Sequence, residues 1–182
     1  HGFIDQALKK ADLQLSDIDY FCTGVGPGSF TGIRVSLNTI KSFAYCFNKP
    51  VLAIDSLKAL AWQCVEEKNL PIISMINAYK NMVYISTYKK NSNGSLITTT
   101  EPAVVRVQNL ESYFSETSVV VGDGYLAYEK YFSDTLKSKM SRPKNPSDFP
   151  RADSIAALSY LNNSAANHWS KILPIYLRAS EA

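Results

Sequence analysis

The sequence predicts an α/β protein built on a parallel or mixed sheet. Its first third alternates strand and helix patterns in the order β, α, β, α, which favours such a sheet over a helical bundle or a sandwich. The 182 residues are 46% hydrophobic and 19% charged, as in globular rather than disordered chains. This length is enough for one large domain or for two small domains that share a core.

The N-terminal elements follow from hydrophobic periodicity and from capping residues. Apolar residues recur at helical spacing from the first residues onward, and a glycine-rich turn separates the first strand from a long helical pattern. Asp55 or Ser56 is expected to cap the last helix of this part. The predicted elements are a helix over residues 1–11, a strand near 18–23, a helix over about 31–47, a strand over 51–54 and a helix over 56–67.

The pattern changes after residues 67–71, where we expect a domain boundary. The following segments are rich in β-branched and aromatic residues, and NSNG at 91–94 is typical of a hairpin turn. Three prolines predict an irregular loop over 141–150. The other predicted elements are strands over 70–77, 81–90, 95–105 and 118–122, and helices near 108–114, 126–132 and 152–161.

Charge and cysteine content exclude several classes of protein. The formal net charge of +3 is too small to indicate nucleic-acid binding. Cys22, Cys46 and Cys64 form an odd, widely spaced set in apolar segments, so we interpret them as buried thiols in a reducing compartment rather than as a disulfide or metal site. No apolar run approaches the roughly 20 residues of a membrane helix. A soluble, cytoplasmic protein without a metal site is expected.

The stretch GVGPGSFTGIRVS, residues 24–36, matches none of the common catalytic or phosphate-binding loops. It has no P-loop lysine, its GxGxxG pattern is broken at Ser29, and a nucleophile elbow would need GxSxG with a nearby histidine. Two readings stay open: a capped strand-to-helix corner, or an anion site made of free N–H groups. The residues concerned are Gly26, Pro27, Gly28, Ser29, Thr31, Gly32 and Arg34.

The helix after this turn carries two faces without charge. One is the apolar stripe of Ile33, Leu37, Ile40, Ala44 and Phe47, which we expect to face the core. The other is a nearly opposite stripe of small side chains: Val35, Thr39, Ser42 and Cys46. A helix with two such faces usually packs on two sides, so the second face is expected to meet another helix of this chain or another subunit.

Several segments together resemble the TsaB (YeaZ) family, paralogues of the TsaD proteins. They are GPGSFTGIR (26–34), KPVLAIDSLKALA (49–61), NMVYISTY (81–88), VVVGDG (119–124), RADSIAALS (151–159) and LPIYLR (173–178), and they cover nearly the whole chain in matching order. The resemblance implies an actin-like, Hsp70-like fold of two ribonuclease-H-like lobes, with the N-terminal hairpin missing. The lobes would be residues 1–69 and 70–182, and the tail of about 172–182 would return to the first.

The resemblance also implies a function. TsaB proteins are non-catalytic partners of TsaD, which carries the metal and active site, and of the ATPase TsaE, in threonylcarbamoyl transfer to the adenosine beside the anticodon of tRNA. No catalytic residue, metal or firmly bound cofactor is then expected here, with ATP and tRNA met only through the complex. The expected interface with TsaD, or with a second copy of this chain, comprises Phe3, Ile4, Ala7, Val35, Thr39, Ser42, Phe43 and Cys46.

Two alternative functions predict different features. A stand-alone actin-fold ATPase or kinase needs an interior acid for a metal, for which Asp123 is the best candidate. A metallopeptidase of the kind ascribed to TsaD relatives needs an HxxxH pair, but His1 and His168 lie at opposite ends of the sequence. The family commonly reads Asp-Ala-Arg-Arg-x-Glu where this chain has Asn77 to Met82, which removes two acids and one base. We expect Arg178 to anchor the tail and His168 to be a surface or packing residue.

Overall fold

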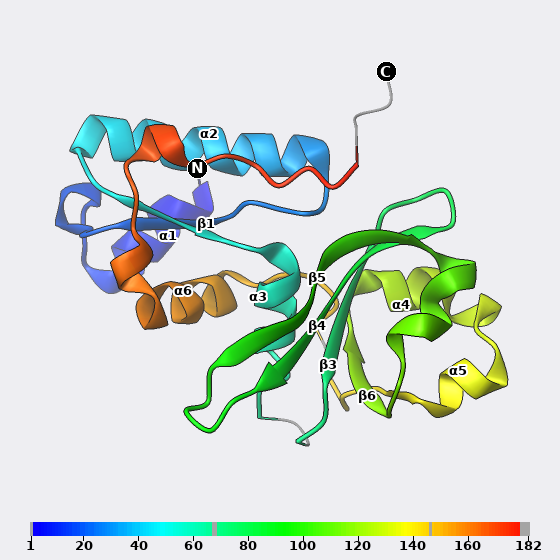
Figure 1. The fold of residues 1–182 in the computed structure, drawn as a ribbon. Coiled ribbons are helices and arrows are strands. Elements are labelled where there is room, and N and C mark those ends of the chain that lie inside the picture. The colour runs from blue at the N-terminus through cyan, green and yellow to red at the C-terminus, as the bar shows by residue number, and fades with distance from the viewer. Residues whose placement is uncertain (1, 67–68, 146, 179–182) are drawn as a thin grey trace.

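The computed structural model in Figure 1 describes residues 2–66, 69–145 and 147–178. Within these ranges the strands form a two-stranded parallel sheet in the N-terminal part and a five-stranded mixed sheet after it. The predicted α/β class with a parallel or mixed sheet is therefore confirmed. No helix within the same ranges is long and apolar enough to span a membrane.

The N-terminal part has the predicted order of elements. After α1 (Gly2–Ala11), strand β1 (Phe21–Gly24) pairs in parallel with β2 (Val51–Ile54), and α2 (Phe30–Phe47) connects them. Strand β1 starts three residues later than Ile18, because residues 15–17 form a 3₁₀ turn that the N–H of Ile18 closes onto Leu15. Among the described residues of α1, none is buried, although its pattern is amphipathic.

Helix α2 has a defined cap at each end. The Ser29 hydroxyl accepts a hydrogen bond from the Gly32 N–H at 3.3 Å, and Asn48 ends the helix in the left-handed conformation with φ 49°. The predicted core stripe is confirmed: Ile33, Leu37 and Ala44 are buried, and Ile40 and Phe47 pack against the same cluster.

Helix α3 (Ser56–Trp62) is shorter than predicted. Asp55 caps it by accepting the Lys58 N–H at 3.0 Å, but the chain turns at Gln63 instead of continuing the helix. Residue 67, the last of the predicted helix, lies outside the described residues. One face of α3 packs on the five-stranded sheet, with Leu57, Leu60 and Cys64 in its core cluster. Figure 1 shows α3 between the two sheets.

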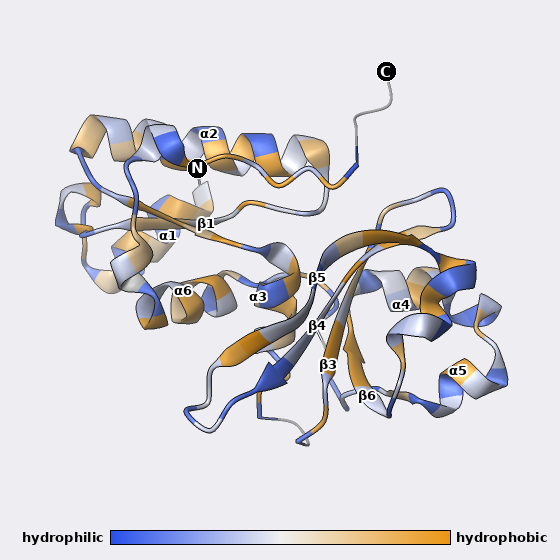
Figure 2. Ribbon diagram, in the orientation of Figure 1, coloured by the Kyte–Doolittle hydropathy of each residue, from blue (hydrophilic) through white to orange (hydrophobic). Residues whose placement is uncertain are grey.

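The five-stranded sheet has the strand order β5-β4-β3-β6-β7. Figure 2 shows that its inner strands are largely hydrophobic. This fits the burial of every residue of β6 and of the first five residues of β3. The strands are β3 (Ile72–Asn77), β4 (Met82–Lys90), β5 (Leu96–Arg106), β6 (Ser118–Val121) and β7 (Met140–Ser141).

Several predictions for the second half need correction. The predicted helix near 108–114 is the 3₁₀ helix η2 (Val107–Tyr113), and the helix near 126–132 begins earlier, as α4 (Asp123–Tyr128) followed by η3 (Glu129–Tyr131). Short α5 (Asp134–Ser138) and β7 were not predicted, because five-residue and two-residue elements have too little periodicity to detect. By contrast, α6 (Ala152–Leu161) has the predicted bounds.

The chain returns to the first sheet already at α6, before the predicted tail. Leu158 of α6 clusters with Ile54 of β2 and Ala59 of α3. Two 3₁₀ turns, η4 (Asn163–Ala165) and η5 (Trp169–Lys171), follow. Below, "N-terminal lobe" means the β1–β2 sheet with the helices and tail packed on it, and "C-terminal lobe" means the five-stranded sheet with α4, α5 and η2.

The cysteine prediction is correct for one residue of three. Cys64 is buried in the core, Cys22 in β1 is half-buried, and Cys46 is exposed. Cys46 has apolar sequence neighbours, but it lies on the side of α2 that points away from the core, where chain neighbours do not cover it.

Candidate functional site: an interlobe cleft and an exposed helix face

A cleft of about 1180 Å³ lies between the two lobes, and both lobes line it. The N-terminal lobe contributes β1, the glycine-rich loop and the start of α2. The C-terminal lobe contributes the β3–β4 turn and Asp123, and the loop before α6 and the tail residues Ile175, Tyr176 and Arg178 close the rim. The cleft thus collects most of the segments that the sequence analysis singled out.

The glycine-rich loop is a capped corner, with Gly26 at its tightest point. Gly26 has φ +104°, and a Cβ there would lie 2.7 Å from the Ile175 carbonyl oxygen. The Gly26 carbonyl accepts the Ser56 N–H at 2.8 Å, which ties the loop to the start of α3. The cap comes from Ser29, whereas Thr31 is exposed. Arg34 lies over the Phe30 ring at 5.2 Å, and anion binding by this loop remains a prediction.

Gly28→Val is expected to lower the free energy of unfolding by about 1–3 kcal/mol. Gly28 has φ +153°, which disfavours a branched side chain, while open space surrounds its Cβ position, so the cost comes from backbone strain alone. Urea denaturation measures it. The matched control is Gly32→Ala, whose Cβ would meet only ordinary contacts with Ser29 inside the helix and should not destabilise. Equal melting of Gly28→Val and wild type would show that the corner is unstrained.

The opposite wall of the cleft is a tight turn between β3 and β4. Tyr79, Lys80 and Asn81 all have left-handed backbones, with φ of 58°, 51° and 58°. Such a run is uncommon for residues with side chains. The Ala78 N–H donates to the Met82 carbonyl at 3.0 Å, and the Asn77 side chain accepts the Tyr79 N–H at 2.8 Å. The segment that departs from the family pattern is therefore a hydrogen-bonded turn on the cleft wall.

Asp123 points back into the fold instead of standing free in the cleft. Its carboxylate accepts the Asn77 N–H at 3.0 Å. Burial raises the pKa of Asp123, and the nearby Asp148 charge acts in the same direction. In the described part of the chain, no group of three His, Cys, Asp or Glu side chains is placed to hold a metal ion. The arrangement suits a carboxylate that braces the β3–β4 turn.

Asp148 is the second cleft acid, and it is part of an ion pair that the sequence analysis missed. Arg142 Nη2 donates to both carboxylate oxygens of Asp148, at 2.9 and 2.8 Å, and the guanidinium lies 4.6 Å from the centre of the Tyr125 ring. Asp148 also accepts the Gly122 N–H at 2.9 Å. Both charged side chains are largely buried, with 20% and 10% exposed, so the pair fixes the loop before α6 onto the C-terminal lobe.

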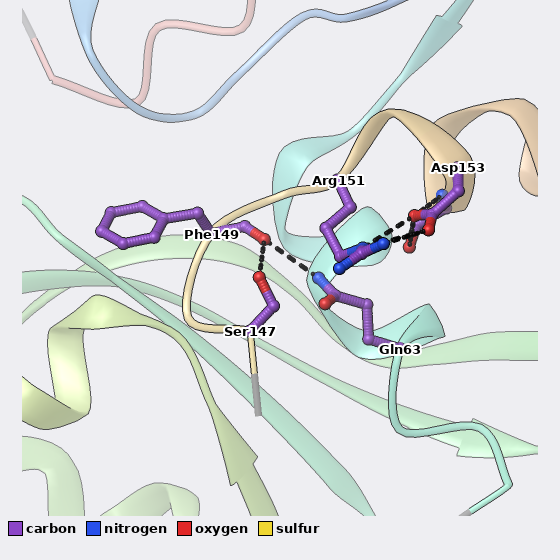
Figure 3. Close-up of polar contacts among 6 residues, drawn as sticks. Gln63, Ser147, Phe149, Arg151 and Asp153 are labelled. Atoms are coloured by element: carbon purple, nitrogen blue, oxygen red, sulfur yellow. Dashed lines mark hydrogen bonds and ion pairs between the residues drawn. The ribbon is translucent and has the colours of Figure 1, made fainter. Parts of the chain in front are cut away.

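The same loop is tied to α3 on its other side (Figure 3). The Phe149 carbonyl accepts hydrogen bonds from the Gln63 amide at 3.0 Å and from the Ser147 hydroxyl at 3.1 Å. Arg151 and Asp153 pair at the start of α6. These contacts hold the Phe149 backbone while its ring, 65% exposed, lines the cleft.

Asp55→Asn is expected to melt at a higher temperature than wild type at pH 7, because burial disfavours the Asp55 charge. Burial raises the pKa of Asp55, although hydrogen bonds from the Lys58 and Leu57 amides oppose the change. A raised pKa means that the stabilising contribution of Asp55 is complete below the ordinary aspartate pKa and falls as the pH rises through the folded-state value. Asparagine keeps the cap without the charge.

Melting curves between pH 4 and pH 8 test this expectation, with Asp55→Ala as the control. Alanine removes the cap as well as the charge, so Asp55→Ala should be about 1 kcal/mol less stable than Asp55→Asn at every pH. The advantage of Asp55→Asn should shrink as the pH falls. If Asp55→Asn is instead clearly less stable than wild type at neutral pH, the charge itself stabilises the α3 terminus.

The predicted interface residues form an exposed patch, with one exception. On α2, Ser42 and Cys46 are exposed and Val35 is 62% exposed; Thr39 is half-buried. On α1, Ala7 is exposed, Ile4 is half-buried and Phe3 is 89% exposed. Phe43 does not belong to this patch, because its ring packs on Phe21 in the core at 5.9 Å. We call the remaining seven residues the α1–α2 face.

The C-terminal segment packs on a side of α2 other than the α1–α2 face. It runs along α2 (Figure 1), where Trp169 packs on Tyr45 at 5.5 Å and Tyr176 packs on Phe30 at 4.9 Å. Phe30 and Tyr45 lie on the flank between the core stripe and the second stripe. The core and the tail therefore cover two sides of α2, and the α1–α2 face is left over.

Arg178 and His168 have the structural roles expected from the sequence. Arg178 donates to the Ala78 carbonyl at 2.7 Å, and exposed His168 caps η5 and packs on Trp169 at 5.1 Å. The contact of Arg178 with the β3–β4 turn could not be predicted from local patterns, because the two segments are 100 residues apart.

Comparison with known proteins agrees with this architecture. The model of the TsaD family, tRNA N6-adenosine threonylcarbamoyltransferase, matches residues 1–182. The chain is 27% identical to the tRNA threonylcarbamoyladenosine biosynthesis protein TsaB of Buchnera aphidicola subsp. Schizaphis graminum over 88% of this chain and 76% of that protein. It is 25% identical to TsaB of Bacillus subtilis over 98% of this chain and 78% of that protein.

A solved structure gives the same answer for the fold. YeaZ from Pseudomonas aeruginosa superposes with a TM-score of 0.78 at 24% identity, covering 96% of this chain and 80% of that one. The actin-like, ribonuclease-H-like fold implied by the sequence resemblance is thereby confirmed. The chain belongs to the TsaD family and, within it, to the TsaB (YeaZ) group.

Proposed function

We propose that this chain is a non-catalytic subunit in the formation of threonylcarbamoyladenosine on tRNA, and that it binds a TsaD-like catalytic subunit through the α1–α2 face. The names of its relatives support the pathway. The α1–α2 face is the observation that carries the mode of action, because most of its residues are exposed on α1 and α2, and Phe3, Ile4 and Thr39 also line the cleft.

The chemistry of this face suits a helix partner. Val35 and Phe3 expose apolar surface whose burial would stabilise a complex. Ala7, Thr39, Ser42 and Cys46 are small, so the backbone of a partner helix can come close. No side chain of the face is charged, and charged residues are depleted at the centres of protein interfaces.

The finer details of the assembly form part of the same proposal. Without the catalytic subunit, a second copy of the chain would occupy the α1–α2 face and give a homodimer. A TsaE-like ATPase would join the complex, and ATP and tRNA would meet this chain only there. Because its target is tRNA, we place the protein in the cytoplasm.

Neither alternative function finds support in the residues that would have to act. Asp123, the candidate acid of an ATPase or kinase, is occupied by the Asn77 N–H, and burial disfavours its charge. His168, the candidate ligand of a peptidase, shares a contact with the Ser170 hydroxyl at 2.8 Å. Asp123 and His168 therefore both have structural roles.

Reconstitution tests the proposed function. The purified chain is expected to hydrolyse neither ATP nor peptides, and to be required for threonylcarbamoyl transfer when added to TsaD-like and TsaE-like proteins of the same organism with tRNA. Mass spectrometry of the tRNA nucleosides measures the product. Full product formation without this chain, or hydrolysis by it that a single substitution abolishes, would contradict the proposal.

A further inference from the structure

We infer that residues 172–178 act as a clasp that joins the two lobes across the cleft and holds its width. The inference concerns the isolated chain and does not rest on the proposed function. It follows from two attachments of the same short segment, one on each lobe.

The first attachment is to the N-terminal lobe. Ile172 is 4% exposed and belongs to the core cluster that contains Phe21, Leu37 and Val51. Three residues later the Ile175 N–H donates to the Val25 carbonyl at 2.7 Å, directly before the glycine-rich loop. The absence of a side chain at Gly26 leaves the space that the Ile175 carbonyl needs. This part of the segment is therefore built into the lobe.

The second attachment is to the C-terminal lobe. Arg178 Nη1 donates to the Ala78 carbonyl at 2.7 Å, a charge-assisted and therefore comparatively strong hydrogen bond. Ala78 is 4% exposed and starts the left-handed turn of residues 79–81, which its own hydrogen bonds hold rigid. Arg178 therefore grips a fixed point of the cleft wall rather than a loose loop.

Two points of attachment restrict motion that one point would allow. Apart from the tail, the lobes are joined where α3 packs on the five-stranded sheet and by the loop before α6, and a rotation about these contacts would open the cleft. The Arg178 contact ties the glycine-rich loop to the β3–β4 turn and so opposes this rotation. Because Tyr176 of the clasp also packs on Phe30, the clasp links the width of the cleft to α2.

The three native cysteines allow opening of the cleft to be measured directly. Cys22 is half-buried and lines the cleft, Cys46 is exposed on α2, and Cys64 is buried in the core beneath α3. Labelling of the folded protein with N-ethylmaleimide, followed by mass spectrometry of the peptides, gives three rates in one experiment. These rates separate opening of the cleft from a change at the surface and from global unfolding.

In Arg178→Ala we expect Cys22 to be labelled about tenfold faster, as follows from losing a hydrogen bond to a charged donor. The Cys46 rate should stay unchanged and Cys64 should stay protected. The matched control is Lys171→Ala, which removes an exposed cation just before the clasp and should leave all three rates as in wild type. Hydrogen exchange of the Met82 amide, which donates to Tyr79, should also accelerate in Arg178→Ala alone.

Unchanged Cys22 labelling and unchanged Met82 exchange in Arg178→Ala would overturn the clasp. If Arg178→Ala exposes Cys64, and thus unfolds, the same readouts on Arg178→Gln decide, because glutamine keeps a donor but is too short for the contact. Faster Cys22 labelling in Arg178→Ala, together with a failure of the wild-type chain to bind the TsaD-like subunit, would contradict the proposed function and leave the clasp standing.

Discussion

Gly122→Ala is expected to prevent the C-terminal lobe from folding. Gly122 has φ +114° and ψ 157°, a region that residues with a side chain essentially avoid. A Cβ at this position would overlap the carbonyl oxygen of Met75 in the neighbouring strand and press on Leu60 of α3 at 3.3 Å. The collision involves backbone at the centre of the sheet, so no side-chain movement relieves it.

The expected loss exceeds about 4 kcal/mol, which is a large part of the stability of an ordinary domain. Soluble yield and the midpoint of urea denaturation measure it. Gly94→Ala provides the matched control: Gly94 also has positive φ, +78°, but its nearest neighbour is the flexible end of Lys90 at 4.0 Å. That variant should cost only about 1 kcal/mol. Similar midpoints for the two variants would show that β3 can shift to accept a side chain.

Ser42→Glu is expected to abolish binding of the TsaD-like subunit without affecting the fold. Ser42 is exposed, and its hydroxyl bonds only to the Asn38 carbonyl of its own helix, at 2.8 Å, so a carboxylate is well tolerated in the free chain. At the centre of an interface the same carboxylate would be buried without a partner. That costs about 3–5 kcal/mol, or more than 100-fold in affinity.

Ser138→Glu is the matched control for Ser42→Glu. Ser138 is also an exposed helical serine whose hydroxyl bonds to its own helix, through Thr135, but it lies in α5 of the C-terminal lobe. Pull-down with the TsaD-like protein and sedimentation of the free chain compare both variants with wild type. If Ser42→Glu binds fully and melts at the normal temperature, the partner binds at a site other than this face of α2.

The bounds of helices and strands could be predicted best where the residues that determine them lie within the element itself. Helix α2, strand β2 and helix α6 could be predicted closely, because the apolar pattern lies within each segment and Ser29 also caps α2. Helix α3 was predicted too long. Its apolar pattern continues through Cys64, but those residues turn to pack on the sheet, a tertiary effect that periodicity does not report.

The candidate site shows the same limit more sharply. Ser29 and Gly28 were identifiable, since capping and backbone strain are local properties. The pairing of Arg142 with Asp148 and the contact of Arg178 with Ala78 depend on where distant segments meet. The packing of the Phe43 ring on Phe21 could not be predicted for the same reason, because helical spacing places Phe43 beside the second stripe but does not report its contact with a strand.

The position of α3 between the two sheets has a consequence for folding. Leu57 and Leu60 complete the core of the five-stranded sheet, while Ala59 packs with Ile54 and Leu158 on the other side. Dividing the chain at residues 67–68 would leave α3 with the N-terminal half. The core of the five-stranded sheet would then lose Leu57 and Leu60, and the face of α3 that carries them would be exposed to water. The two lobes are therefore not independent folding units, and heat or denaturant should melt them together in one cooperative transition.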